Sequence, residues 1–219
     1  MDTTSAPQII EHIHQSLDYT PTDTKWIPRS ARFTASGVSP KGTGILKVYA
    51  LEKGNANVIF SLDHVCKTGI KCMTLGQSRL DNRQIAVGDY SGLIRIFDLK
   101  NMSEDPIYSV QAHESLINCI DGIGGIPGHG SPEIVSGGKD GCVRVWDPRV
   151  DHAVVSLEPD KDQNARDCWT VSFGNAYNVD ERCIVAGYDN GDVKMYDLRM
   201  NVLRWEVNCS NGVTGNFIY

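Results

Sequence analysis

The residue types of a serine-hydrolase triad occur close together in this chain. His113, Ser136 and Asp140 could form a site in which histidine takes the proton of the serine hydroxyl and aspartate orients the histidine. Ser136, however, lies within an apolar strand pattern, IVSGG, whereas a nucleophilic serine needs a sharp, exposed turn. The surrounding segment also recurs elsewhere in the chain. We therefore interpret these three residues, with Trp146, as a structural set and predict no catalytic residues.

Two further groups could bind a ligand, and we interpret both as structural. His12 and His14 are two residues apart on a predicted strand, but the sequence places no further ligands for a metal ion. The loop DGIGGIPGHG (121–130) is rich in glycine. A dinucleotide fingerprint needs a third glycine where Pro127 stands and a helix afterwards, and here a strand follows. We therefore predict no metal and no cofactor.

The candidate residues lie in a segment that the chain repeats. The three clearest copies are IAVGDYSGLIRIFDLK (85–100), IVSGGKDGCVRVWDPR (134–149) and IVAGYDNGDVKMYDLR (184–199). Each contains an apolar strand, a polar turn with glycine, a second strand and an aromatic–Asp pair, and these pairs are 49 and 50 residues apart. A weaker copy, FTASGVSPKGTGILKVYALE (33–52), precedes them. A period this regular indicates repeated supersecondary units.

Each unit is expected to fold into four short strands. Alternating polarity, β-branched residues and turn signals favour strands, and no segment shows a sustained helical period. Four-stranded antiparallel units repeated around an axis form a β-propeller, so we predict an all-β, WD-repeat propeller. Trp26 and Trp205 are interpreted as packing residues of its strands.

The repeats also suggest boundaries. The predicted blades cover about 24–64, 69–112, 113–160 and 165–209, after an N-terminal strand at 7–16 and before a non-propeller tail at 210–219. Most WD propellers close with seven blades, and closure removes unpaired edges. Four blades therefore predict an open, incomplete ring, and we expect the chain to be the N-terminal portion of a longer protein.

The third unit resembles WD repeats most fully. In such propellers an Asp–His–Ser–Trp relay of hydrogen bonds stabilises a blade, which implies this role for His113, Ser136, Asp140 and Trp146. The other units lack the relay. At the places of Ser136, Asp140 and Trp146 the fourth unit has Ala186, Asn190 and Tyr196, and the second has Val87, Ser91 and Phe97.

Two Asp-x-Arg turns, ending in Arg149 and Arg199, occupy the same place in consecutive blades. Some propellers use paired turns of this kind to dock on the adaptor of a cullin ubiquitin ligase, and the planar fork of arginine suits such an interface. Alternatively, the aspartates bind turn amides while the arginines are solvated or pair locally. Both interpretations remain open from the sequence.

Arg166 and Asp167 open the fourth blade, where the relay histidine would stand. They are expected to reach the narrow face on which adaptors usually grip peptides. Alternatively, Asp167 only caps the turn. We retain both residues, with Arg149 and Arg199, as candidate protein-binding positions.

The amino-acid composition limits the classes of partner that the chain is expected to bind. The 219 residues include 21 Lys and Arg against 27 Asp and Glu, giving a net charge of −6, which argues against nucleic acid or an anionic membrane as the main partner. No apolar run approaches the roughly 20 residues of a membrane span, and the start lacks the features of a signal peptide. The seven cysteines contain no CxxC pair, and we interpret them as free thiols of a cytoplasmic protein.

Stretches outside the repeat signatures are more specific. They are PQIIEHIHQSLDYT, INCIDGIGG, PEIVSGGKDGCVRVWDPR, RDCWTVSFGNAYN and AGYDNGDVKMYDLR. Together they resemble the Monad family of WD-repeat proteins from about Pro7 to Val213, and the chain departs from that family at the final TGNFIY. The resemblance implies a non-enzymatic cytosolic scaffold, a co-chaperone adaptor in the preassembly of axonemal dynein arms. The implied partners are RuvB-like ATPases, prefoldin-like subunits and dynein chains. The alternative function is a substrate receptor of a cullin ubiquitin ligase.

Overall fold

The computed structural model describes most of the chain. The described residues are 11–52, 54, 58–79, 81–102, 105–125, 130–159, 165–174 and 182–215. They form strands and turns, and none of the described segments is a helix. Accordingly, no described helix could cross a membrane. The predicted all-β class is confirmed.

Four antiparallel sheets, which we call blades 1 to 4, each contain four consecutive strands. Blade 1 contains β1 (Thr20–Trp26), β2 (Arg32–Val38), β3 (Gly44–Ala50) and β4 (Ile59–Cys66). Blade 2 contains β5 (Ile70–Thr74), β6 (Gln84–Asp89), β7 (Leu93–Asp98) and β8 (Tyr108–Gln111). Blade 3 contains β9 (Ile117–Ile123), β10 (Glu133–Gly138), β11 (Val143–Trp146) and β12 (Ala153–Leu157). Blade 4 contains β13 (Cys168–Gly174), β14 (Cys183–Tyr188), β15 (Asp192–Asp197) and β16 (Val202–Asn208).

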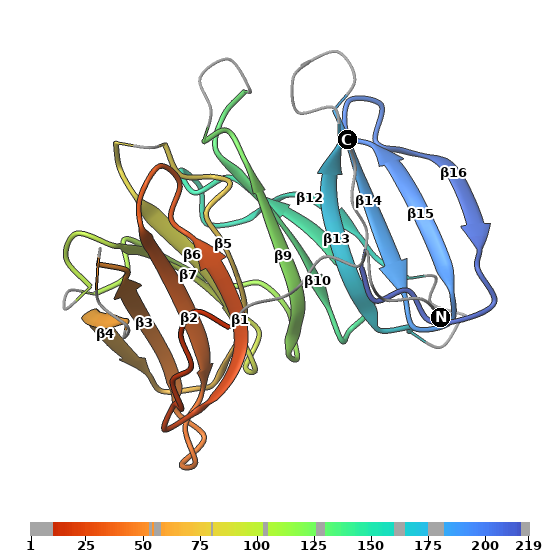
Figure 1. Cartoon of the computed structure of the whole chain (residues 1–219). Helices are drawn as coiled ribbons and strands as arrows, with labels where there is room; N and C mark the ends of the chain where they lie inside the picture. Colours follow the sequence, from red (N-terminus) through yellow and green to blue (C-terminus); the bar gives the residue numbers. More distant parts are fainter. Residues whose placement is uncertain are drawn as a thin grey trace, which may run out of the picture.

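The blades stand side by side in chain order (Figure 1). The first strand of each blade contacts the first strand of the next: β1 contacts β5, β5 contacts β9, and β9 contacts β13. Because each blade is a meander, the loops leaving its first and third strands lie at one end of the sheets, and the loop leaving its second strand lies at the other. The result is the open arc of a β-propeller, as predicted.

The cores lie between blades, and alternate residues of one central strand enter different cores. Ile85 and Val87 of β6 pack against blade 1, whereas the intervening Ala86 packs against blade 3. Ile134 and Val135 of β10 likewise enter the cores toward blade 2 and blade 4. Side chains alternate across a strand, so an apolar strand without polar alternation fits a position covered on both faces. This explains the apolar runs of the repeat.

The N-terminal region differs from the prediction. Of the predicted strand 7–16, residues 7–10 lie outside the described residues, and 11–16 belong to no strand. Blade 1 begins at Thr20, before the predicted start, because its first strand is held by contacts with blade 2. The Thr22 hydroxyl donates to the Ile70 carbonyl at 2.8 Å, and Asp23 Oδ2 accepts from the Met73 amide at 2.9 Å.

The two tryptophans interpreted as packing residues lie at the surface, although the Trp26 ring packs edge-on against Phe33, with ring centroids 5.5 Å apart. Trp26 at the end of β1 is 61% exposed, and Trp205 on the outermost strand β16 is 42% exposed. Every residue of β16 is exposed in this structure, so alternating residue types there do not mark a buried face.

Candidate protein-interaction site

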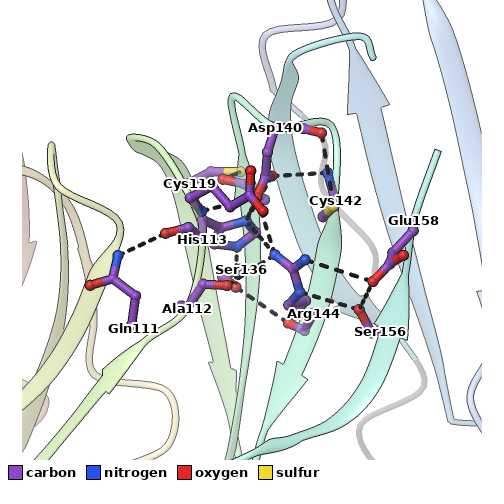
Figure 2. A network of polar contacts seen from close by, with 12 residues as sticks. Gln111, Ala112, His113, Cys119, Ser136, Asp140, Cys142, Arg144, Ser156 and Glu158 are labelled. Atoms are coloured by element: carbon purple, nitrogen blue, oxygen red, sulfur yellow. Dashed lines mark hydrogen bonds and ion pairs between the residues drawn. The ribbon is translucent and has the colours of Figure 1, made fainter. Parts of the chain in front are cut away.

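The structure brings His113, Ser136 and Asp140 together in blade 3 (Figure 2). Trp146 of β11 joins them through its indole. His113 Nδ1 is 2.8 Å from Asp140 Oδ1, and His113 Nε2 is 2.8 Å from Ser136 Oγ. The Trp146 indole donates to the same Ser136 oxygen at 2.9 Å. This continuous relay joins the segment before β9 to the second and third strands of the blade and to the turn between them.

The relay has the residue order of a hydrolase triad but lacks its access. Asp140 accepts from His113 Nδ1, and His113 Nε2 lies within hydrogen-bond distance of the Ser136 hydroxyl. Ser136, however, has no exposed surface, and Trp146 covers its oxygen. A substrate carbonyl cannot approach this hydroxyl. In this blade the group therefore fixes strand register instead of performing nucleophilic chemistry.

Asp140 is the charged end of the relay. Burial by itself would raise the pKa of this carboxyl, but the hydrogen bond and charge of His113 and the contacts of Cys142 and Arg144 hold it well below its usual value. Arg144 Nη1 lies 3.2 Å from Asp140 Oδ2 and also donates to the Ala112 carbonyl at 3.0 Å (Figure 2). Asp140 thus remains ionised and ties three segments together.

Glycine at one position makes the relay fit. A Cβ on Gly138 would lie 2.3 Å from His113 Nδ1 and 2.6 Å from Asp140 Oδ1, closer than real Cβ atoms come to other atoms. Gly141, in the following turn, has a φ of 76°, a conformation that glycine adopts without steric cost. The sequence GGKDG therefore leaves room for the histidine ring and closes the turn that carries Asp140.

Blade 2 uses a different buried polar group at the same place. The strand pairings align Asp89 with Gly138 and Arg95 with Arg144. Asp89 is fully buried, lies 2.7 Å from Arg95 Nη1, and accepts bonds from the amides of Ser91 and Leu93. Sequence analysis missed this ion pair. The available signal was the shared arginine position in two aligned repeats.

Blade 4 has neither the relay of blade 3 nor the buried ion pair of blade 2, and a cavity lies at the corresponding place. Tyr188 aligns with Gly138, and Lys194 lies 5.6 Å from the centre of its ring. The cavity, of about 460 Å³, lies between blades 3 and 4. Its lining includes Tyr188, Asn190, Lys194 and Tyr196, together with Arg166 from the segment that supplies the histidine in blade 3.

Arg166 and Asp167 lie at the end of the sheets where the turns between the second and third strands lie. The Arg166 backbone lies against Gly141 in the β10–β11 turn. The Asp167 carbonyl accepts the Asp189 amide at 3.0 Å, in the turn between β14 and β15. Arg166 is exposed and Asp167 is half-buried.

Arg149 and Arg199 lie at the opposite end, just after the third strands of blades 3 and 4. The Arg149 Nε contacts the two carboxylate oxygens of Asp147 at 2.9 and 3.0 Å, and its side chain is 69% exposed. This hydrogen bonding lowers the pKa of Asp147 and raises that of Arg149. In blade 4, Asp197 accepts the backbone amide of Arg199 at 2.9 Å. Both aspartates therefore bind turn amides.

The remaining candidates are the two N-terminal histidines and the glycine-rich loop. His12 and His14 lie in the segment before β1, and His14 is 3.5 Å from Glu11. Across the part of the chain that the structure describes, no three His, Cys, Asp or Glu side chains gather as a metal site. In the glycine-rich loop, Pro127 and its neighbours 126, 128 and 129 lie outside the described residues.

Comparisons with known proteins agree with the propeller fold and with the relay of blade 3. The family "WD domain, G-beta repeat" matches residues 104–147, the segment that contains the relay. A solved structure titled "Crystal Structure of Mitotic Checkpoint Complex" contains a chain that superimposes with a TM-score of 0.72 and 15% identity. The superposition covers 96% of this chain and 60% of that one. The chain thus has the fold of a WD-repeat propeller, and residues 104–147 match the repeat family itself.

Several curated relatives of this chain share one name. The protein from Chlamydomonas reinhardtii named dynein axonemal assembly factor 10 is 48% identical over 217 residues, covering 98% of this chain and 60% of the relative. The Homo sapiens protein of the same name is 47% identical over 215 residues, covering 97% of this chain and 59% of the relative. The chain thus spans about three fifths of the length of these relatives.

Proposed function

We propose that this chain is a non-enzymatic protein-interaction scaffold that takes part in the assembly of axonemal dyneins. The observation that carries the proposal is the 48% identity, over almost the whole chain, to a protein named dynein axonemal assembly factor 10. The matched region covers 98% of this chain, so it spans the loops at the ends of the sheets as well as their cores. These loops present most of the side chains that a partner could contact.

The polar groups of the blades support a scaffold. The Ser–His–Asp side chains of blade 3 hydrogen-bond to one another and to Trp146 in the relay. The Asp89–Arg95 pair of blade 2 is buried within its sheet. Both groups are placed to hold strands in register. A frame that presents loops at both ends of its sheets suits binding to other proteins, because binding residues are often carried on loops that a scaffold positions.

The finer role that we propose is a cytoplasmic co-chaperone adaptor. Its partners would be RuvB-like ATPases with prefoldin-like subunits, and its clients dynein chains. Support comes from the resemblance of INCIDGIGG and RDCWTVSFGNAYN to the Monad family. The net charge of −6 also favours protein partners over nucleic acid.

Affinity purification from ciliated cells tests the proposal. A tagged form of the chain is expected to recover dynein chains and RuvB-like ATPases, identified by mass spectrometry. The matched control is the same tagged chain with Asp140→Ala, which loses the relay and should recover less of both in proportion to its folded fraction. Recovery of neither class by the unaltered chain would overturn the proposal.

The contacts within the two Asp-x-Arg turns do not favour the alternative function as a ligase receptor. Arg149 directs its guanidinium at Asp147 of its own turn, and Asp197 binds the amides of Arg199 and Met200. These contacts match the local role that aspartates and arginines play in ordinary turns. An Arg199→Ala variant, which leaves the Asp147–Arg149 contact in place, is expected to leave the recovery of dynein chains unchanged.

A further inference from the structure

A small cavity lies between blades 2 and 3, beside the turn that carries Arg149. Its volume is about 240 Å³. The β5–β6 loop contributes Gln77, Arg79 and Asn82 to its lining, and blade 3 contributes Asp147 and Arg149. It is separate from the relay, which lies around Asp140 at the other end of the strands.

Gln77 is the buried polar residue of this cavity. Its side chain is 3% exposed and lies against Gly122 of β9. Its Nε2 makes a long hydrogen bond of 3.4 Å to the Gln84 carbonyl, while its Oε1 is buried without a partner among the described residues. A buried acceptor without a donor costs free energy, so this oxygen favours an occupant that brings an N–H group.

Unused donors lie around the same cavity. The Asp147 carboxylate is neutralised by Nε and Nη2 of Arg149, which leaves Arg149 Nη1 outside that contact. The contacts of Arg79 with other described residues all use its backbone carbonyl, so its guanidinium has no carboxylate partner there. Among the lining residues Arg79 is therefore the uncompensated charge, and the cavity is positive on a chain whose net charge is −6.

We infer that this cavity binds an acidic peptide segment of a partner protein. An aspartate of the partner pairs its carboxylate with Arg79 and Arg149 Nη1, and a backbone N–H of the same segment donates to Gln77 Oε1. A volume of 240 Å³ is below the roughly 300–1,000 Å³ of small-molecule sites, so it suits one side chain with its peptide group. The inference rests on the proposed function as a scaffold and names the partner chemistry of one of its surfaces.

A pair of synthetic peptides tests this assignment. One is a fluorescein-labelled peptide of repeated Ser-Asp-Gly units, and the other has Asn in place of each Asp. The 219-residue chain is titrated into each, and fluorescence anisotropy reports binding. The Asp peptide is expected to bind and the Asn peptide to bind at least about tenfold more weakly, because hydrogen bonds to charged groups are the stronger ones. The overall negative charge of the chain opposes non-specific binding of an acidic peptide.

Variants separate this site from a general effect of charge. Arg79→Gln should weaken binding of the Asp peptide about tenfold, whereas Arg32→Gln, an exposed arginine on blade 1, should not. Gln77→Met removes the unpartnered acceptor, so it should weaken binding without lowering the thermal unfolding midpoint. Equal weakening by Arg32→Gln and Arg79→Gln, equal binding of the two peptides, or no binding at about 1 mM would overturn the inference.

The proposed function is tested separately with the same variant. If tagged Arg79→Gln recovers dynein chains as well as the unaltered chain does, the scaffold proposal stands and the cavity is not its binding site. If the Asp peptide binds as expected but the unaltered chain recovers no dynein chains, the cavity assignment stands and the proposed function does not.

Discussion

Asp89 of blade 2 pairs with Arg95 at the position where blade 3 has a glycine and a histidine relay. The carboxylate has no exposed surface, and its Oδ2 is 2.7 Å from Arg95 Nη1. At the aligned place in blade 3, Gly138 leaves space that the His113 ring occupies. Neighbouring repeats therefore stabilise the same strand junction by two different polar arrangements, each satisfied within its own blade.

The ion pair of blade 2 is expected to be far more important for stability than the exposed pair of blade 3. Arg95→Ala leaves a fully buried carboxylate without a counter-charge, and breaking such a pair costs about 3–5 kcal/mol. Arg149→Ala removes an arginine that is 69% exposed, and surface pairs contribute about 0–1 kcal/mol. Urea unfolding of both variants gives the two free-energy changes.

Comparing Arg95→Ala with Arg149→Ala separates the effect of burial on stability, because both variants remove one arginine from an Asp–Arg contact. A loss of less than about 1 kcal/mol for Arg95→Ala would show that Asp89 is hydrated or protonated without its partner. It would also remove the argument that blade 2 has its own substitute for the relay.

The relay of blade 3 is expected to make Asp140 more important than its counterpart in blade 4. Asp140→Ala leaves His113, which is 2% exposed, without its acceptor, and an unsatisfied buried group costs about 1–3 kcal/mol. Asn190→Ala removes only contacts within its own turn, to Asp192. Equal denaturant midpoints for the two variants would mean that the relay contributes nothing to stability.

The depressed pKa of Asp140 predicts a dependence of stability on pH. Although burial opposes it, the hydrogen bond and charge of His113 keep the pKa below that of the unfolded chain. A group whose pKa is lowered by folding stabilises the protein above its unfolded pKa, about 3.9 for aspartate, and that contribution is lost as the pH falls through the folded value. The difference in unfolding free energy between the unaltered chain and Asp140→Asn should therefore shrink as the pH falls below about 4.

A second carboxylate serves as the control for this pH dependence. Asp197 also has a lowered pKa, from turn amides, but its charge is exposed to solvent. Asp197→Asn should change the acid limb of the stability profile much less than Asp140→Asn does. A profile for Asp140→Asn that parallels the unaltered chain down to about pH 2 would contradict the assignment of the charge to Asp140.

The relay could be predicted because the third unit resembles WD repeats, in which these residue types form such a relay. The Asp89–Arg95 pair could not be predicted in the same way. Within a strand, a charged residue normally marks the solvent-facing side, and only the packing of neighbouring blades buries this one. Gln77 is similar, since a polar loop residue becomes buried only when β9 lies against it.

Strand β1 shows why the start of blade 1 was misplaced. Its sequence, TPTDTKW, has no alternating apolar residues, so a pattern search passes over it. Tertiary bonds from Thr22 and Asp23 to β5 hold it in the sheet. By contrast, the alternating segment IIEHIH (9–14) has no strand in its described part, residues 11–14. Alternation alone does not supply the neighbouring edge that a strand needs.

The last prediction concerns Gly138, whose missing side chain makes room for the relay. A methyl group there would lie 2.3 Å from His113 Nδ1, so Gly138→Ala must displace the imidazole or the Asp140 turn and break at least one relay bond. We expect a loss of about 1–3 kcal/mol in urea unfolding, the cost of unsatisfied buried groups. Gly215→Ala is the control, because no atom lies within 4 Å of its Cβ position and its φ is not in the left-handed region. The two effects of Gly138→Ala and Ser136→Ala should not add, because either one disconnects His113 from its partners, and residues of one network are coupled. If the double variant loses the sum of the two single losses, Gly138 acts through backbone strain alone and the relay does not depend on it.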